Sequence, residues 1–139
     1  MRYPFKCDDD SFEGIFSEHV LEHFYVDDAR RILQECFRVL KPRGCIRLSI
    51  PDVSQCVRDY LKAKERVESA HLAAECVRLL TQEFLHLSVW DFERLAYELE
   101  SVGFVEVRQC GFREGSDSNM LFDLESRSDE SFYIEGKKP

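Results

Sequence analysis

The sequence predicts an α/β fold, with parallel strands joined by crossover helices and an antiparallel strand near the C-terminal edge of the sheet. Three observations predict it. Apolar strands alternate with amphipathic helices, two of the strands end in polar turns, and the last two strands have no helix between them. Strands separated by helices favour right-handed crossovers and hence a parallel sheet. Because 139 residues suit a single hydrophobic core, we expect one domain over residues 1–139.

A strand, a helix and a second strand are predicted in the first part of the chain. The segment Phe12–Ser17 carries apolar residues after an acidic run and indicates a short buried strand. Residues 27–40 place apolar side chains at helical spacing and predict an amphipathic helix, with Asp27 as its N-cap and a turn at 41–44 as its end. The segment Cys45–Ile50 predicts the next strand, which ends in a polar turn.

Three further helices are expected in the middle of the chain. Apolar side chains recur at helical spacing in 53–61 and in 69–86. The third helix is predicted to begin after Asp91, whose carboxylate can cap it, and to end at Gly103.

The C-terminal part predicts two strands that flank a polar segment. Residues 104–110 alternate between apolar and polar side chains, and Ser131–Glu135 indicates a last short strand. We expect the polar, acidic residues 111–130 between them to be a disordered connection rather than a lid. With no helix to separate them, the two strands are expected to form an antiparallel hairpin at one edge of the sheet.

Composition and charge narrow the classes of function. The net charge is −8, with 27 acidic and 19 basic residues and no cluster of Lys and Arg, which argues against a nucleic-acid partner held by electrostatic attraction. No apolar run approaches the ~20 residues of a membrane span, and the acidic N-terminus has no apolar region typical of a secretory signal. Six widely spaced cysteines without a CxxC pair suit free thiols in a reducing compartment. We therefore expect a cytoplasmic protein.

The segment His19–His23, HVLEH, has two interpretations. On a helix, its two histidines lie on one face and can bind Zn²⁺ while Glu22 serves as general base, as in zinc metalloproteases. Alternatively, the strand before it delivers the polar residues Ser17–His19 to the carboxyl edge of a parallel sheet, where a second strand brings Asp52 and where such sheets bind ligands. The second interpretation accounts for the whole neighbourhood, so we favour it and predict no metal site.

Longer stretches carry a family resemblance. An acidic turn, strand and VLEH-type segment, DDDSFEGIFSEHVLEHF, are followed by the helix and strand ARRILQECFRVLKPRGCIRLSIPD and by the tail HLSVWDFERLAYELESVGFVEVR. In this order they resemble the carboxyl-terminal portion of a class I S-adenosylmethionine (SAM)-dependent methyltransferase. The resemblance implies a partial Rossmann-like methyltransferase sheet. It also implies transfer of a methyl group from SAM to an acceptor that the sequence does not identify.

The resemblance implies roles for the residues that follow the first strand. Ser17, Glu18 and His19 would line the methionine portion of the cofactor or the space of the methyl acceptor. His19 would either accept a proton from an acceptor hydroxyl or amine, or only hydrogen-bond a loop. Glu22 and His23 are expected to cap and pack the segment rather than to take part in chemistry.

The resemblance also implies a pocket for the acceptor. Asp52 would orient the acceptor or cap the helix that follows it. His86 and Trp90 would line the pocket or belong to the core and a helix cap. Tyr3 and Phe5 would lie near the adenine edge of the cofactor.

Departures from the family pattern limit these expectations. These 139 residues contain no GxGxxG-like loop with an acidic residue for the ribose hydroxyls, and Arg43 replaces the first glycine of the LKPGG turn. We therefore expect a truncated family member with weak or absent SAM binding by this chain alone. The alternative is a non-catalytic methyltransferase-like interaction module. Because the family pairs Phe12–Ser17 with a strand missing here, we expect its exposed edge to mediate self-association or to bind a partner chain.

Overall fold

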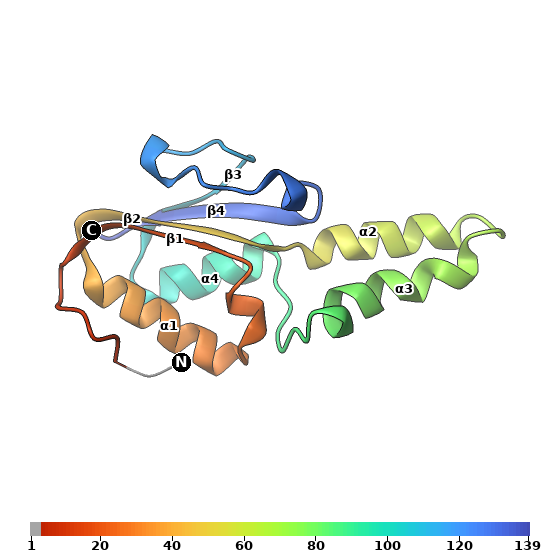
Figure 1. Ribbon diagram of the computed structural model, residues 1–139, viewed down its shortest axis with the longest axis horizontal. Helices are drawn as coiled ribbons and strands as arrows, with labels where there is room; N and C mark the ends of the chain where they lie inside the picture. The colour runs from red at the N-terminus through yellow and green to blue at the C-terminus, as the bar shows by residue number, and fades with distance from the viewer. Residues whose placement is uncertain (1–3) are drawn as a thin grey trace.

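The computed structural model describes residues 4–139 as a sheet with helices on one face, a long loop on the other and a helical arm at one end (Figure 1). The first strand and helix are followed by a longer strand, and the arm precedes the last helix and two strands. The helices and strands are β1 (Phe12–Glu18), α1 (Val26–Val39), β2 (Leu40–Pro51), α2 (Val53–Lys64), α3 (Ala73–Arg78), α4 (Phe92–Val102), β3 (Val105–Cys110) and β4 (Ser131–Lys137).

The sheet has the strand order β1-β2-β4-β3, with β1 and β2 parallel and β4 antiparallel to both of its neighbours. Ile15 lies opposite Ile46 in the parallel pair, and Leu48 lies opposite Ile134 in the antiparallel pair. The expected α/β fold class is confirmed. The last two strands pair antiparallel as expected, but β4 lies inside the sheet beside β2, so only β3 of this pair forms an edge.

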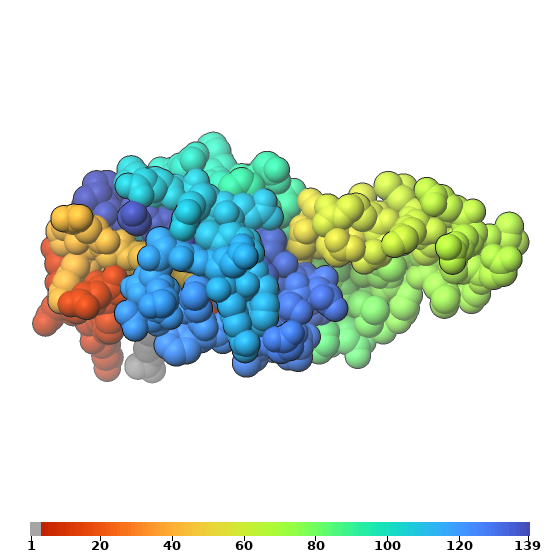
Figure 2. All heavy atoms as spheres, turned by 90° about the horizontal axis from the view of Figure 1, so that it is seen from above, coloured from red at the N-terminus to blue at the C-terminus, as the bar shows by residue number. Residues whose placement is uncertain are grey.

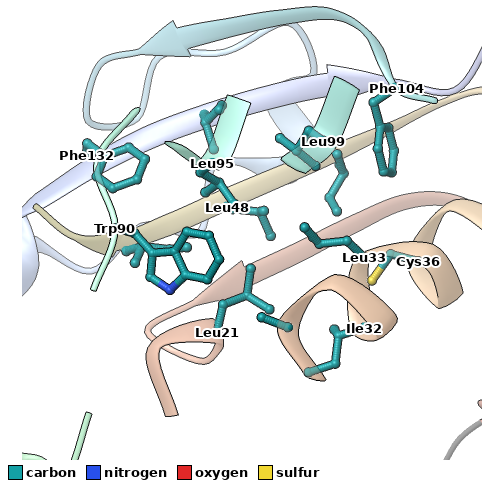
Figure 3. Close-up of a cluster of buried hydrophobic side chains, with 14 of the residues drawn as sticks. Leu21, Ile32, Leu33, Cys36, Leu48, Trp90, Leu95, Leu99, Phe104 and Phe132 are labelled. Atoms are coloured by element: carbon teal, nitrogen blue, oxygen red, sulfur yellow. The ribbon is translucent and has the colours of Figure 1, made fainter. Parts of the chain in front are cut away.

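The hydrophobic core lies between the sheet and the helices α1 and α4 (Figure 3). Side chains alternate along β2, so that Ile46, Leu48 and Ile50 all join the core while the residues between them point to the opposite face. Leu33 of α1 and Leu99 of α4 are fully buried against them. Burying an aliphatic side chain of this size contributes about 1.5–3 kcal/mol, which explains why these two helices hold their positions.

The ends of α1 differ from those predicted. The helix begins at Val26 with Tyr25 as its N-cap, so Asp27 lies in the first turn and does not cap it. There its charge complements the partial positive charge of the helix N-terminus instead. Residues 41–44, expected as a turn, belong to the long strand β2, where Arg43 takes a left-handed conformation with φ of 68°. A register shift in β1, between Phe12 and Gly14, accompanies this irregular start of the β1–β2 pair.

The middle of the chain forms an arm that projects from the sheet (Figures 1 and 2). Residues 69–86, expected as one helix, are divided into a 3₁₀ turn at Ala70–Leu72, α3, and a π-helical turn at Leu79–Glu83. Within this stretch the Thr81 hydroxyl donates a hydrogen bond to the carbonyl of Val77 at 2.7 Å, a contact that often bends helices. No residue of α2 is buried, so the arm stands largely outside the core.

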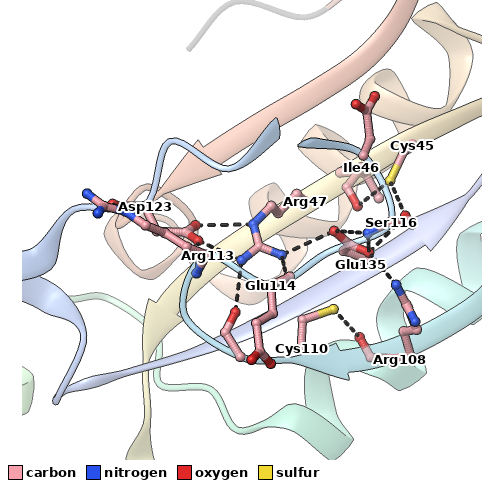
Figure 4. A network of polar contacts seen from close by, with 12 residues as sticks. Cys45, Ile46, Arg47, Arg108, Cys110, Arg113, Glu114, Ser116, Asp123 and Glu135 are labelled. Atoms are coloured by element: carbon pink, nitrogen blue, oxygen red, sulfur yellow. Dashed lines mark hydrogen bonds and ion pairs between the residues drawn. The ribbon is translucent and has the colours of Figure 1, made fainter. Parts of the chain in front are cut away.

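Residues 111–130 are ordered, which corrects the expectation of a disordered connection. They cover the face of the sheet opposite the helices and are held there by the fully buried Arg47 of β2 (Figure 4). The Arg47 guanidinium donates hydrogen bonds to both carboxylate oxygens of Asp123, at 2.6 and 3.1 Å, and to Glu135 at 3.1 Å. It also donates to the carbonyls of Gly111 and Glu114. Polar composition led to the wrong prediction because Asp123, the buried polar residue of this loop, is paired with Arg47 on the sheet.

Candidate functional site

The parallel strands β1 and β2 end side by side and bring two polar segments to one edge of the sheet. Glu18 lies opposite Ser49, and the His19 backbone N–H donates to the Ser49 carbonyl at 2.9 Å. His19 then turns the chain sharply with a φ of 50°, a left-handed conformation that is uncommon outside glycine. Asp52 follows directly after β2. The convergence predicted from the order of strands and polar turns is therefore present in the structure.

A cavity of 230 Å³ lies at this edge, between the strand ends and the arm. His19, Asp52 and His86, all predicted as site residues, line it together. Its remaining walls come from the arm and from the segment before β4, and they include Gln55, Cys56, Asp59, Cys76, Asp129 and Glu130. Of the residues that the arm contributes to this wall, sequence reasoning named only His86, because the apolar spacing of 53–61 and 69–86 predicts helices without placing their other side chains.

Asp52 caps the helix that follows it, one of the two roles that the sequence left open. One carboxylate oxygen accepts a hydrogen bond from the Ser54 backbone N–H at 2.9 Å and so caps α2. The other accepts a hydrogen bond from Arg58 at 3.1 Å. Asp52 also lines the cavity, although both of its carboxylate oxygens have protein partners.

His19 is held firmly at the cavity wall. Its Nε2 is hydrogen-bonded to the Ser131 hydroxyl at 2.7 Å, and its side chain is nearly buried. Burial, assisted by the positive charge of Arg127, lowers the pKa of His19 to about 4. The ring is therefore neutral near pH 7, so that it offers a nitrogen lone pair rather than a positive charge.

Glu22 is the site residue that sequence reasoning missed. Its side chain is buried, and neither carboxylate oxygen has a hydrogen-bond partner among the described residues. Nitrogen atoms of His19, His23 and His86 surround it at 3.8, 3.9 and 4.0 Å from Oε1. Burial raises the pKa of Glu22 to about 7. The only sequence signal was its position within HVLEH, since His86 joins the cluster from the far end of the arm.

The same segment lacks the helix that a zinc-protease signature needs. His19 follows the strand β1, and Leu21–His23 form a single 3₁₀ turn. His19 and His23 therefore do not share a face of a continuous helix, and the metalloprotease alternative loses its structural basis.

Other predicted residues take different places. Of the two places left open for Trp90, the acceptor pocket and the core, the structure shows the core, with Nε1 donating to the Ser88 hydroxyl at 2.8 Å. Its large apolar ring is 1% exposed, and burial in the core accounts for its position. Glu18 accepts a hydrogen bond from the Leu124 backbone N–H, and the Phe5 N–H donates to Glu35. Tyr3 lies outside the described residues.

None of the described helices is long and apolar enough to cross a membrane.

Comparisons with known proteins connect this edge of the sheet to a family. Residues 3–48, which include β1, α1 and most of β2, match the family model described as "Methyltransferase domain". No curated protein matches the sequence.

Solved structures match over nearly the whole chain. A SAM-dependent methyltransferase from Archaeoglobus fulgidus is 16% identical with a TM-score of 0.60, over 95% of this chain and 62% of that one. A SAM-dependent methyltransferase from Thermotoga maritima is 20% identical with a TM-score of 0.57, over 97% and 60%. PigF, solved with SAH, is 11% identical with a TM-score of 0.55, over 91% and 30%. The chain thus spans less than two thirds of the length of each.

At these identities the solved structures establish the fold, and the family model supplies the sequence relationship over the first third of the chain. The resemblance seen in the sequence is confirmed on both grounds. The chain has the fold of class I SAM-dependent methyltransferases, and its residues 3–48 match the sequence pattern of a methyltransferase domain.

Proposed function

We propose that this chain provides the acceptor-binding half of a SAM-dependent methyltransferase. The observation that carries the proposal is the 230 Å³ cavity at the carboxyl ends of β1 and β2, lined by His19 and Asp52. Ligands of open α/β sheets bind at this edge. The family model covers the strand and helix that create the edge, which supports methyl transfer as the reaction.

The chain supplies only part of a SAM site. Ser17, Glu18 and His19 at the end of β1 would contact the methionine portion of the cofactor, whose sulfonium provides the methyl group when bound. The sequence includes no paired glycines to cradle the cofactor, and no strand with an acidic end follows such a loop to bind its ribose. Each missing charge-assisted hydrogen bond is worth roughly 1.5–3 kcal/mol. Losing two of them weakens binding about a thousandfold, so we propose that this chain alone binds SAM weakly.

The charge of the cavity supports a proposal about the acceptor. Four carboxylates line it, and of these Asp52 is already paired with Arg58. Asp59, Asp129 and Glu130 remain to contact a bound molecule. We propose that the acceptor presents an amine or another positively charged group to this wall, either as a small molecule or as a side chain of a macromolecule. His19 and Asp52 are the residues that we propose to contact its reacting atom.

Titration of the isotopically labelled chain with SAM, followed by NMR, tests the proposed function. NMR detects millimolar binding and locates it, and we expect the largest shift changes at Ser17–His19. Methylthioadenosine, which lacks the amino-acid portion of SAM, is the matched control and should leave these three residues nearly unchanged. Saturation at micromolar SAM would contradict the proposed weak site, and shift changes confined to the other end of the sheet would contradict its location.

A second experiment tests the acceptor class with the same spectra. A primary alkylamine should shift the resonances of Asp59 and Glu130, whereas the carboxylic acid of the same size should not. Equal responses to both compounds would show that the charge of the wall does not select the acceptor.

A second role, as an interaction module, rests on the open edge of β1. In the described chain, β1 is hydrogen-bonded to β2 on one side and begins with an exposed Phe12. The outer backbone groups of an edge strand are a template for pairing with another strand. We propose that Phe12–Ser17 mediates self-association or binds a partner chain.

We also propose that the protein works in the reducing cytoplasm. All six cysteines are free, and Cys36 and Cys45 are buried as small apolar side chains. This is the pattern of thiols that need no oxidising compartment.

A further inference from the structure

Glu22 presents an unusual problem of solvation. Its side chain is 2% exposed, yet both carboxylate oxygens lack a hydrogen-bond donor among the residues that the structure describes. A buried polar group without a partner is costly, and a buried carboxylate is retained where it is paired or coordinates a metal ion. Its backbone carbonyl, by contrast, is satisfied by the N–H groups of Leu87 and Ser88. The unpaired carboxylate therefore indicates a bound partner that is not a group of the protein.

Two histidines direct nitrogen atoms toward this carboxylate. The Nε2 of His23 lies 3.9 Å from Glu22 Oε1, and the Nε2 of His86 lies 4.0 Å from the same oxygen. The ligand atoms of these three residues all lie within 4.8 Å of one another. Ligand atoms about 2.0–2.2 Å from a tetrahedral Zn²⁺ lie roughly 3.3–3.6 Å apart, so side-chain rotations would have to draw the three atoms closer together to coordinate one ion.

The protonation of His86 is fixed by its surroundings. Its Nδ1 lies 2.5 Å from the carbonyl oxygen of Leu80, and because a carbonyl only accepts, Nδ1 carries the proton. The lone pair therefore resides on Nε2, the atom that faces Glu22. A histidine that donates one ring N–H to a backbone carbonyl and presents the other nitrogen is arranged as metal-binding histidines are.

We propose that Glu22, His23 and His86 form a binding site for a divalent transition-metal ion, with Zn²⁺ as the ion that fits best. Two imidazole nitrogens and one carboxylate oxygen suit Zn²⁺, whereas Ca²⁺ and Mg²⁺ prefer oxygen ligands alone. Three protein ligands leave one position of a tetrahedral ion open to water or to a further ligand. The site differs from the protease signature, because Glu22 is a ligand and His86 replaces His19. It also departs from our prediction that the chain has no metal site.

The site is accessible from solvent. A second cavity, of 340 Å³, is lined by His19, His23 and His86 together with Arg127 and Glu130, and it provides a path for the ion. His19 also lines this cavity, with Nδ1 at 3.8 Å from Glu22 Oε1. The proposal does not depend on methyltransferase activity.

A bound ion would join two parts of the molecule that are distant in sequence. Glu22 and His23 belong to the turn after β1, and His86 belongs to the end of the arm. His86 also lines the 230 Å³ cavity, so an ion at this site would fix one of its walls relative to the sheet. We therefore expect Zn²⁺ both to bind and to stabilise the folded chain.

The test uses the whole chain, stripped of metal with a chelator and titrated with Zn²⁺ against a chromophoric competitor. We expect one equivalent to bind and the melting temperature to rise. His86→Gln and His23→Gln should each weaken the affinity more than about 100-fold, since even residues that only support metal ligands account for about 10–100-fold. The exposed His71, outside the cluster, provides the matched control, and His71→Gln should leave the affinity unchanged.

Two further measurements keep the result decisive. The His23 side chain is 43% exposed, so His23→Gln removes a ligand with little loss of packing, and its folding can be checked by circular dichroism. Co²⁺ in place of Zn²⁺ distinguishes the proposed nitrogen and oxygen ligands from the six thiols, because a thiolate ligand adds a strong charge-transfer band in the near ultraviolet. Such a band, the absence of Zn²⁺ binding by the parent chain, or equal losses in His23→Gln and His71→Gln would overturn the proposal.

Discussion

At the scale of single residues, Arg47 decides whether the loop 111–130 stays on the sheet. Its guanidinium is the buried cation for Asp123 and Glu135. Arg47→Met keeps much of the side-chain volume but leaves Asp123 buried without its cation and Glu135 with Arg108 alone, and we expect a loss of about 3–5 kcal/mol in the free energy of unfolding. Urea denaturation measures it. Arg31→Met, which removes an exposed partner of Asp28, should leave the urea midpoint nearly unchanged. Equal midpoints for the two variants would contradict this role of Arg47.

Glu98 of α4 sets a pH dependence of stability at the same scale. Its fully buried carboxylate accepts hydrogen bonds from Arg30, at 2.7 and 2.9 Å, and from Arg94. The hydrogen bonds from Arg30 lower the pKa of Glu98 below its ordinary value. The unfolded chain therefore binds this proton more readily, so the stabilisation is complete above the ordinary carboxyl pKa and is lost as the pH falls through the folded pKa.

The corresponding measurement is urea denaturation of the parent chain and of Glu98→Gln from pH 7 downward. The variant should be less stable near pH 7, and the two stability curves should converge as the pH falls below about 4. A difference that stays constant over this range would show that the charge of Glu98 is not the cause. Glu93→Gln, on an exposed part of the same helix, is the control for a general effect of charge.

At the scale of elements, the arm should open more readily than the rest of the fold. No residue of α2 is buried, and Ala73 is the one buried residue of α3, whereas α1 and α4 contribute Leu33 and Leu99 to the core. Local opening requires less free energy where few apolar contacts are broken. We expect backbone amides of α2 and α3 to exchange with deuterium on the order of 100-fold faster than those of α1 and α4. Uniform protection across all four helices would argue that the arm is part of the cooperative core.

The elements that the sequence predicts well are those with local signals. The helix α4 has an apolar stripe, Asp91 accepting from the Arg94 N–H, and Gly103 in the left-handed conformation after its end, all as expected. The order of the loop 111–130 had no such signal. It depends on the contact between Arg47 and Asp123, which lie 76 residues apart in the chain.

The candidate site shows the same division between local and distant causes. His19 and Asp52 meet because parallel strands end at one edge, a rule that applies before any contact is known. The cluster around Glu22 needs His86, which reaches it only because the arm folds back. Trp90 is the opposite case. It lies close to the site residue His86 in the sequence, but its ring is buried in the core and not at the cavity.

At the scale of the whole molecule, the two edges of the sheet provide a test of association. Phe12 on β1 and Val105 on β3 are each 43% exposed, and they lie on opposite edges. A lysine on an edge strand opposes pairing with another chain. If β1 is the interface, Phe12→Lys should reduce self-association in sedimentation velocity, and Val105→Lys should not. A parent chain that stays monomeric at high concentration, with no partner bound, would contradict the proposed interface.

The projecting arm has a consequence for how this scaffold can change. The core cluster draws its buried members from α1, β2, α4 and β4, and from the segments beside them, while residues 53–89 contribute none. Yet those residues form one side of the 230 Å³ cavity. The residues that form this side of the cavity are thus separate in sequence from those that form the core. Exchanging the arm for that of a distant relative would change which compound the cavity selects and would leave the hydrophobic core unchanged.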